Sequence, residues 1–207
     1  MRINCENIEA NRITEDLERL LQAARDLGAT DAAVIPAARI AVDESLAEKC
    51  RNPKCINYGL SKSCPPNVAG PSAFEKLLEN YTRAVFFKIE VPSDILFSGH
   101  SRELFQLLHE TAAGIEIKAR EMGFSDARAY AGMSCKKVCC GERLESRALL
   151  EDGECMNPDR ARPSMSGFGV HVARLYEAAG WRVKGAAHET DSGTVKMDSI
   201  CGLVLIC

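Results

Sequence analysis

Residues 84–91, Ala-Val-Phe-Phe-Lys-Ile-Glu-Val, form a short run of apolar and β-branched residues. A run of this length and composition predicts a buried β-strand. A helix is predicted on each side of it, because apolar residues recur at helical spacing over residues 72–81 and 101–123. The centre of the chain therefore alternates between helix and strand.

The same alternation continues toward both ends of the chain. The sequence predicts helices over 14–28, 43–50 and 172–179, and extended segments over 31–42, 126–131, 181–185 and 200–206. We expect Thr14 to cap the first helix and Ser72 to cap the one before the central strand. This pattern favours an α/β or α+β fold with a single mixed sheet flanked by helices. A single domain covering residues 1–207 follows from the length.

Composition excludes several classes of protein. The chain has 207 residues, a mass of 22.6 kDa, a net charge of −3 and 46% hydrophobic residues. The near-balance of charges argues against a nucleic-acid-binding protein, and the apolar content argues against disorder. No apolar run approaches the roughly 18 residues of a membrane span, and the first residues do not form a signal peptide. We therefore expect a cytoplasmic protein with no membrane partner.

Cysteine is unusually frequent, with ten residues in the chain. Clustered cysteines in a chain without an export signal usually bind metal or perform redox chemistry. The cysteines concentrate in two segments, 50–71 and 132–165, that carry no regular apolar period and are predicted to be irregular loops. Loops of this length inside a compact domain are usually functional.

The first loop carries Cys50, Cys55 and Cys64, separated by four and eight residues. Prolines and Gly59 between and after them provide the turns that would let three thiolates converge. The Cys64-Pro65 pair resembles iron–sulfur loops, in which proline follows a ligand. Zinc sites usually use closer cysteine pairs, so the spacing fits an iron–sulfur centre better.

The second loop carries Cys135, Cys139, Cys140 and Cys155. The first two and Cys155 are predicted to bind one centre, with Cys140 as the candidate fourth ligand. Lys136 and Lys137 lie between the first two cysteines. We expect these lysines to lower the pKa of the neighbouring thiols and to offset the negative charge of a thiolate-bound cluster.

Two motifs give the chain a family resemblance. They are Tyr58-Gly59 with Cys64-Pro65-Pro66 in the first loop, and Ser134-Cys135…Cys139, Glu154-Cys155-Met156-Asn157-Pro158 and Ala161-Arg162-Pro163-Ser164-Met165 in the second. Over roughly residues 30–207 the chain resembles a family of predicted metal-binding proteins, found mainly in anaerobic bacteria and archaea. The resemblance implies iron–sulfur binding by these cysteines, as [4Fe-4S]. Relatives often carry Cys-x2-Cys-x2-Cys where this chain has Cys-x3-Cys-Cys, which leaves the role of Cys140 open.

Two further residues are candidates for a catalytic role. Arg162 could bind an anionic substrate or a cluster thiolate, because its guanidinium donates in a fixed fork. Ser164 could cap the helix over 172–179. The remaining cysteines, Cys5, Cys201 and Cys207, are expected to be structural, although Cys5, Cys201 or His188 could supply a fourth ligand to the first loop. The other histidines, His100, His109 and His171, show no metal-binding spacing.

The cysteine count leads to one principal hypothesis and several alternatives. The principal one is a protein with one or two [4Fe-4S] clusters in redox chemistry, serving a partner protein or a small molecule. Four thiolates in the second loop would close one cluster, whereas three in the first would leave one iron open to a ligand. The alternatives are a non-redox iron–sulfur enzyme for Lewis-acid dehydration or sulfur transfer, a zinc-binding structural or interaction module, and a single thiol-rich site for redox sensing. A homodimer is possible through the C-terminal strand.

Overall fold

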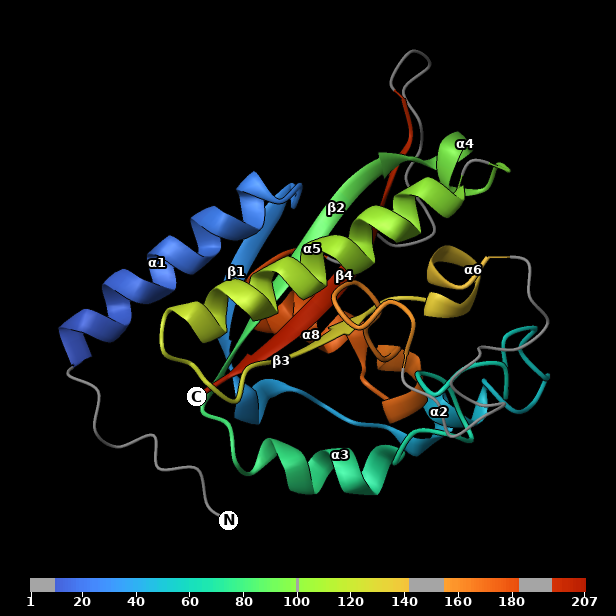
Figure 1. Ribbon diagram of the computed structural model, residues 1–207, viewed down its shortest axis with the longest axis horizontal. Coiled ribbons are helices and arrows are strands. Elements are labelled where there is room, and N and C mark those ends of the chain that lie inside the picture. The colour runs from blue at the N-terminus through green and yellow to red at the C-terminus, as the bar shows by residue number, and fades with distance from the viewer. Residues whose placement is uncertain (1–9, 100, 142–154, 183–194) are drawn as a thin grey trace.

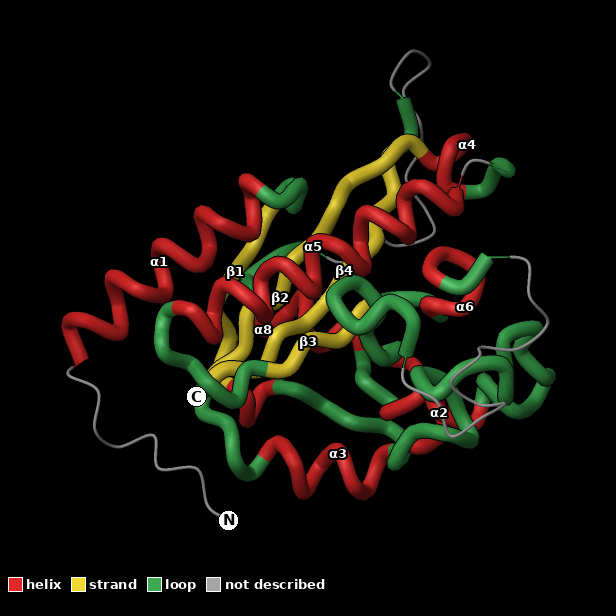
Figure 2. Tube along the Cα trace, in the orientation of Figure 1, coloured by secondary structure: helices red, strands yellow, loops and turns green. Residues whose placement is uncertain are grey.

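The computed structural model describes residues 10–99, 101–141, 155–182 and 195–207. Figure 1 shows one sheet covered by helices on both faces, and Figure 2 shows the long loops gathered at one end. The elements are α1 (Ala10–Asp26), β1 (Asp31–Pro36), η1 (Ala37–Arg39), α2 (Glu44–Glu48), α3 (Pro71–Leu78), β2 (Arg83–Pro92), α4 (Ser93–Leu96), α5 (Ser101–Glu121), β3 (Arg128–Ala131), α6 (Cys135–Cys139), η2 (Met165–Phe168), α8 (Val172–Ala178) and β4 (Met197–Ile206).

The four strands of the sheet lie in the order β1-β2-β4-β3. The predicted fold class, a single sheet flanked by helices, is confirmed. All three strand pairings are antiparallel, whereas a mixed sheet was expected. The central pair is the longest, running from Arg83 opposite Ile206 to Pro92 opposite Met197. The segment 84–91 therefore lies in an interior strand, which explains why it is almost continuously apolar.

Side chains alternate between two apolar layers, one on each face of the sheet. One layer packs under α1 and α5, where Leu20, Leu108 and Ile115 are fully buried against Val85 and Val204. The other packs under α3, η2 and α8. It includes the following residues: Ile35, Phe74, Phe86, Tyr130, Phe168, Leu175, Leu203 and Leu205. This alternation with period two fixes the strand register, because a slip of one residue would exchange the two layers.

Gly202 of β4 is required by its neighbour on β2. A Cβ atom at this position would lie 2.5 Å from the Phe87 ring, which is fully buried, and 3.0 Å from the carbonyl oxygen of Tyr130. The Phe87 ring therefore lies across the backbone of β4 and fills the space that a side chain would take. A glycine in a strand interior often marks such a close approach.

Several element boundaries differ from the predictions. The first helix begins at or before Ala10, so Thr14 lies inside it and is not its cap. The helix before β2 begins at Pro71 with Gly70 as its N-cap, in place of Ser72. Residues 40–42 make only an isolated bridge from Val42 to Val170 rather than a strand. The second cysteine loop contains the short helix α6. Residues 181–182 are not strand, and the rest of the strand predicted over 181–185 lies outside the described residues.

The outer edge of β3 is closed by groups other than a strand. The amide of Ala129 donates to the Glu116 carboxylate at 3.1 Å, and the amide of Ala131 donates to the Pro163 carbonyl at 3.0 Å. Strand β2 pairs with β4 along its whole length, whereas β3 pairs with β4 only over residues 202–205. The expected homodimer stays a prediction. None of the described helices combines the length and apolarity needed to cross a membrane.

Candidate metal centre

Helix α6 and the first cysteine loop lie toward the same end of the molecule (Figure 1). The second loop is closed at its base, because Ala131 and Ser164 form a parallel bridge. The amide of Ser164 also donates to the carbonyl of Ser63 at 3.1 Å, which ties the first loop to the base of the second. Two segments that are far apart in sequence therefore share one region.

Turns in the first loop bring its three cysteines together. The Cys55 amide donates to the Cys50 carbonyl at 2.9 Å, which closes a tight turn between those two residues. The Gly59 amide donates to the Pro65 carbonyl at 2.8 Å and folds the rest of the loop back, and Gly59 has a φ of +80° that favours glycine. Cys64 is buried, Cys50 is half-buried and Cys55 is exposed.

Helix α6 positions the cysteines of the second loop. Cys135 and Cys139 are its first and last residues, and a separation of four places both on one face. Cys140 is the C-cap of this helix. Asn157 attaches the Cys155 segment to this helix, because its side-chain amide donates to the Cys139 carbonyl at 2.7 Å. The Asn157 backbone amide donates to the Cys155 sulfur at 3.4 Å.

The two loops meet at sulfur. The Cys64 thiol donates to the Ser134 hydroxyl at 3.1 Å, and Ser134 is the N-cap of α6, so Cys64 lies beside Cys135. Burial raises the pKa of Cys135, and the nearby hydroxyls of Ser63 and Ser61 offset only part of this rise. Ser61 Oγ is buried and has no hydrogen-bond partner in the described part of the chain. A buried hydroxyl without a partner usually has an unseen one, and the sulfur atoms of a bound cluster could accept a hydrogen bond from Ser61.

Burial and mutual repulsion keep the thiols protonated. Burial, followed by repulsion from Cys135, Cys140 and Cys155, raises the pKa of Cys139 to about 12. Burial also raises the pKa of Cys135, and burial with repulsion from Cys55 and Cys64 raises that of Cys50. These thiols can ionise together only if a cation compensates their charge, so metal binding must release protons.

The prediction that lysines lower these pKa values is wrong for Lys136. Its ammonium donates to the Gly141 carbonyl at 3.2 Å, and burial outweighs any effect of the lysine on the thiols. Arg160, which follows Cys155 in the second loop, offsets part of the rise in the pKa of Cys139. The side chain of Lys137 lies outside the described residues.

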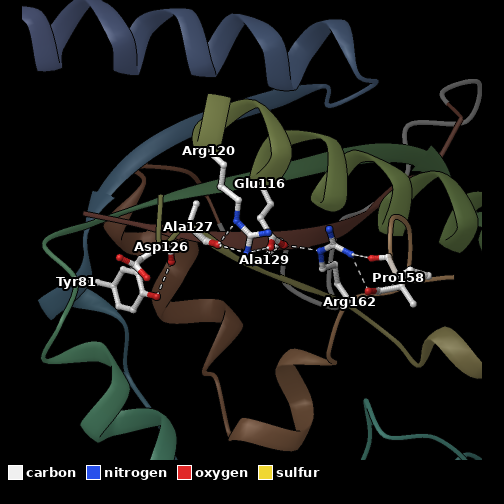
Figure 3. Close-up of polar contacts among 9 residues, drawn as sticks. Tyr81, Glu116, Arg120, Asp126, Ala127, Ala129, Pro158 and Arg162 are labelled. Atoms are coloured by element: carbon white, nitrogen blue, oxygen red, sulfur yellow. Dashed lines mark hydrogen bonds and ion pairs between the residues drawn. The ribbon is translucent and has the colours of Figure 1, made fainter. Parts of the chain in front are cut away.

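Arg162 is buried and fixes the second loop to α5 (Figure 3). Its Nε donates to Glu116 at 2.5 Å, and its Nη1 donates to the carbonyls of Pro158 and Ala161, both at 2.8 Å. Arg120 forms a second ion pair with Glu116, whose carboxylate also accepts the Ala129 amide. Sequence reasoning missed Glu116, although a charged residue four positions after Ala112 on the apolar face of a helix was a usable signal.

Ser164 and His109 lie next to Arg162. Ser164 precedes η2 rather than α8, and its hydroxyl makes no capping hydrogen bond. His109 is fully buried and its Nδ1 accepts the Arg162 amide at 3.2 Å. Burial and the nearby Arg162 lower the pKa of His109 to about 4, so it is neutral. Its Nε2 has no hydrogen-bond partner within the described residues.

The remaining candidates belong to other elements of the fold or lie outside the described residues. Cys201 is buried in β4, where burial raises its pKa to about 12, and Cys207 packs against the layer under α8. His171 is the N-cap residue of α8 rather than part of a helix. Cys5, His100 and His188 lie outside the described residues.

The donor set at the junction fits a thiolate-bound centre. All seven candidates are free thiols, and their electrostatic interactions link the first group to the second through Cys64 and Cys135. Among the residues described, no three His, Cys, Asp or Glu side chains already surround one point as the ligands of a single ion would.

Comparison with known proteins returned one match. No curated protein and no solved structure matches at a significant level. The model of the family DUF2284, described as predicted metal-binding protein, matches residues 33–206, a range that includes both cysteine loops and the whole sheet. The chain therefore belongs to this family of predicted metal-binding proteins.

Proposed function

We propose that the protein binds [4Fe-4S] clusters at the junction of its two loops and acts in redox chemistry. The observation that carries the proposal is the hydrogen bond from Cys64 to Ser134, which brings the first cysteine loop to the start of α6, where the cysteines of the second loop begin. Thiolate sulfur is the usual ligand of iron–sulfur clusters. A bound cluster would supply one-electron transfer. The hydrogen bonds, charges and burial around its ligands would set its reduction potential.

The second loop is the better candidate for a complete ligand set. Cys135, Cys139, Cys140 and Cys155 interact electrostatically with one another, and a cluster held by four thiolates has no open iron. The Asn157 amide already donates to the Cys155 sulfur, and hydrogen bonds to ligand sulfur raise a cluster's reduction potential.

The first loop offers three thiols, so a cluster there would have one iron without a cysteine ligand. Such an iron could bind a small molecule directly, whereas a closed cluster in the second loop would deliver electrons to it. Cys64 donates to the N-cap residue of α6 and interacts electrostatically with Cys135, which supports a short electron path between two such clusters. In this arrangement, a redox protein or a small molecule would donate electrons to the cluster of the second loop.

Metal and acid-labile sulfide analysis of protein purified without oxygen tests the proposal. About eight iron atoms per chain would indicate two cubanes, and about four would indicate one. Cys55→Ser and Cys139→Ser should each remove iron, since they come from the two loops. Cys201→Ser is the matched control, because that buried thiol lies in β4 outside both loops, and it should keep the wild-type iron content. Stoichiometric zinc without sulfide would refute the redox proposal and leave a structural zinc module.

A further inference from the structure

An open cavity of about 620 Å³ lies beside β3. One wall is formed by α3 and the end of the first loop, and the other by β3 and the segment that follows Cys155. The following residues line it: Lys62, Val68, Ala69, Ala73, Phe74, Leu77, Glu116, Arg120, Arg128, Ala129, Tyr130, Pro158, Arg162, Pro163 and Phe168. This volume is within the range of about 300–1,000 Å³ that is usual for small-molecule sites.

The lining carries an excess of positive charge. Arg120 and Arg162 both pair with the single carboxylate of Glu116, so these three side chains keep one uncompensated positive charge. Arg128, the first residue of β3, adds another, and it forms no ion pair with the described part of the chain. Clefts lined by one sign of charge concentrate ligands of the opposite sign.

The remainder of the cavity is apolar and aromatic. Phe74, Tyr130 and Phe168 contact one another with ring centroids 5.1–5.2 Å apart, and all three line the cavity. The Tyr130 hydroxyl makes no hydrogen bond within the described residues. Burial raises the pKa of Tyr130, so this hydroxyl stays protonated and can donate to a ligand.

We propose that this cavity binds a small organic anion, with its carboxylate or phosphate group on Arg128 and Tyr130 and its apolar part against Phe74 and Phe168. Charge complementarity, volume and the aromatic lining each support an anion with a flat apolar portion. The proposal does not depend on the identity of the metal. Because both walls continue into cysteine loops, such a ligand would lie beside the metal centre and is suited to be its substrate or effector.

Calorimetric titration with benzoate, phenyl phosphate and benzyl alcohol tests the proposal on the protein as purified. The two anions should bind saturably, and benzyl alcohol should bind at least about tenfold more weakly because it carries no charge for Arg128. Tighter binding of benzoate would assign the natural ligand to carboxylic acids, and tighter binding of phenyl phosphate would assign it to phosphate esters.

Two variants with a matched control separate a defined site from a general charge effect. Arg128→Gln should weaken anion binding about tenfold or more, and Tyr130→Phe should weaken it a few-fold while keeping the ring contacts. Arg102→Gln removes the same charge from an exposed position on α5 outside the cavity, and it should bind as the wild type does. The proposal is wrong if neither anion binds saturably, if benzyl alcohol binds equally well, or if Arg128→Gln and Arg102→Gln have equal effects. Iron content, measured on the same samples, reports separately on the metal proposal.

Discussion

Replacing Glu116 with glutamine tests how the second cysteine loop is held to the fold. The carboxylate of Glu116 and the guanidinium of Arg162 are 2.5 Å apart, and their side chains are only 7% and 10% exposed. Removing one partner of a buried ion pair costs about 3–5 kcal/mol, because the other charge stays buried without compensation. The glutamine oxygen can still accept the Ala129 amide, and Arg120 is half-exposed and can be hydrated. We therefore expect a loss near the lower limit, about 3 kcal/mol.

Urea denaturation followed by tryptophan fluorescence measures this loss. Trp181 is the only tryptophan, and it packs against Phe86 and Tyr176 with centroids 5.2 and 5.8 Å apart, so its emission should report global unfolding. With a denaturant slope of about 2 kcal/mol/M, the midpoint should fall by about 1.5 M. Glu121→Gln is the control on the same helix. Its carboxylate is 59% exposed and pairs with Lys118, so the loss should stay below about 0.5 kcal/mol.

The reasoning fails if Glu116→Gln lowers the midpoint no more than Glu121→Gln does. A double variant gives a second check. Combining Glu116→Gln with Arg162→Met removes the unpaired buried charge, so the double variant should be less destabilised than the sum of the two single variants. Strict additivity would show that the two side chains do not depend on each other. Iron content should fall in Glu116→Gln as well, because Arg162 anchors the segment that follows Cys155.

Three further variants or conditions probe the sheet, the first loop and a buried histidine. Gly202→Ala should destabilise the protein by about 1–3 kcal/mol in the same urea assay, because its Cβ would lie 2.5 Å from the Phe87 ring, whereas Gly99→Ala, with open space around it, should change little. Gly167→Ala should lower the iron content per chain, because its Cβ would lie 2.9 Å from Pro65, which follows Cys64 in the first loop. An iron content equal to that of the wild type would contradict this expectation. Unfolding free energy should decrease by about 3 kcal/mol from pH 6.5 to pH 4, because burial lowers the pKa of His109 to about 4 and the unfolded chain takes up the proton first. His109→Gln should flatten that part of the pH profile.

Local patterns in the sequence were sufficient to predict most of the elements. Apolar periodicity located α5, β2 and α8, and the proline-rich and glycine-rich stretches located both cysteine loops. Helix starts were less predictable, because Thr14 and Ser72 have capping side chains but the chain continues the helix through or before them. Capping residues are favoured at helix starts without determining them.

Contacts between distant segments could not be predicted in this way. Nothing local indicates that β4 inserts between β2 and β3, or that Cys64 lies against Ser134, 70 residues away. The pKa values of the thiols also depend on burial, which only the fold determines, and so the expected effect of Lys136 was misjudged. Seven cysteines in two loops predicted a metal-binding protein, but the arrangement of their sulfur atoms required the structure.

The position of β4 has a consequence for how the protein is made. Among the described strands, β3 pairs with β4 alone, and β4 is formed by residues 197–206, after the other described strands and both cysteine loops. During synthesis, β1 and β2 can pair as soon as they leave the ribosome, whereas β3 and the second loop have no place to dock until residue 206 has emerged. Assembly of the metal centre is therefore expected to follow translation, and the exposed cysteines need a reducing environment until then.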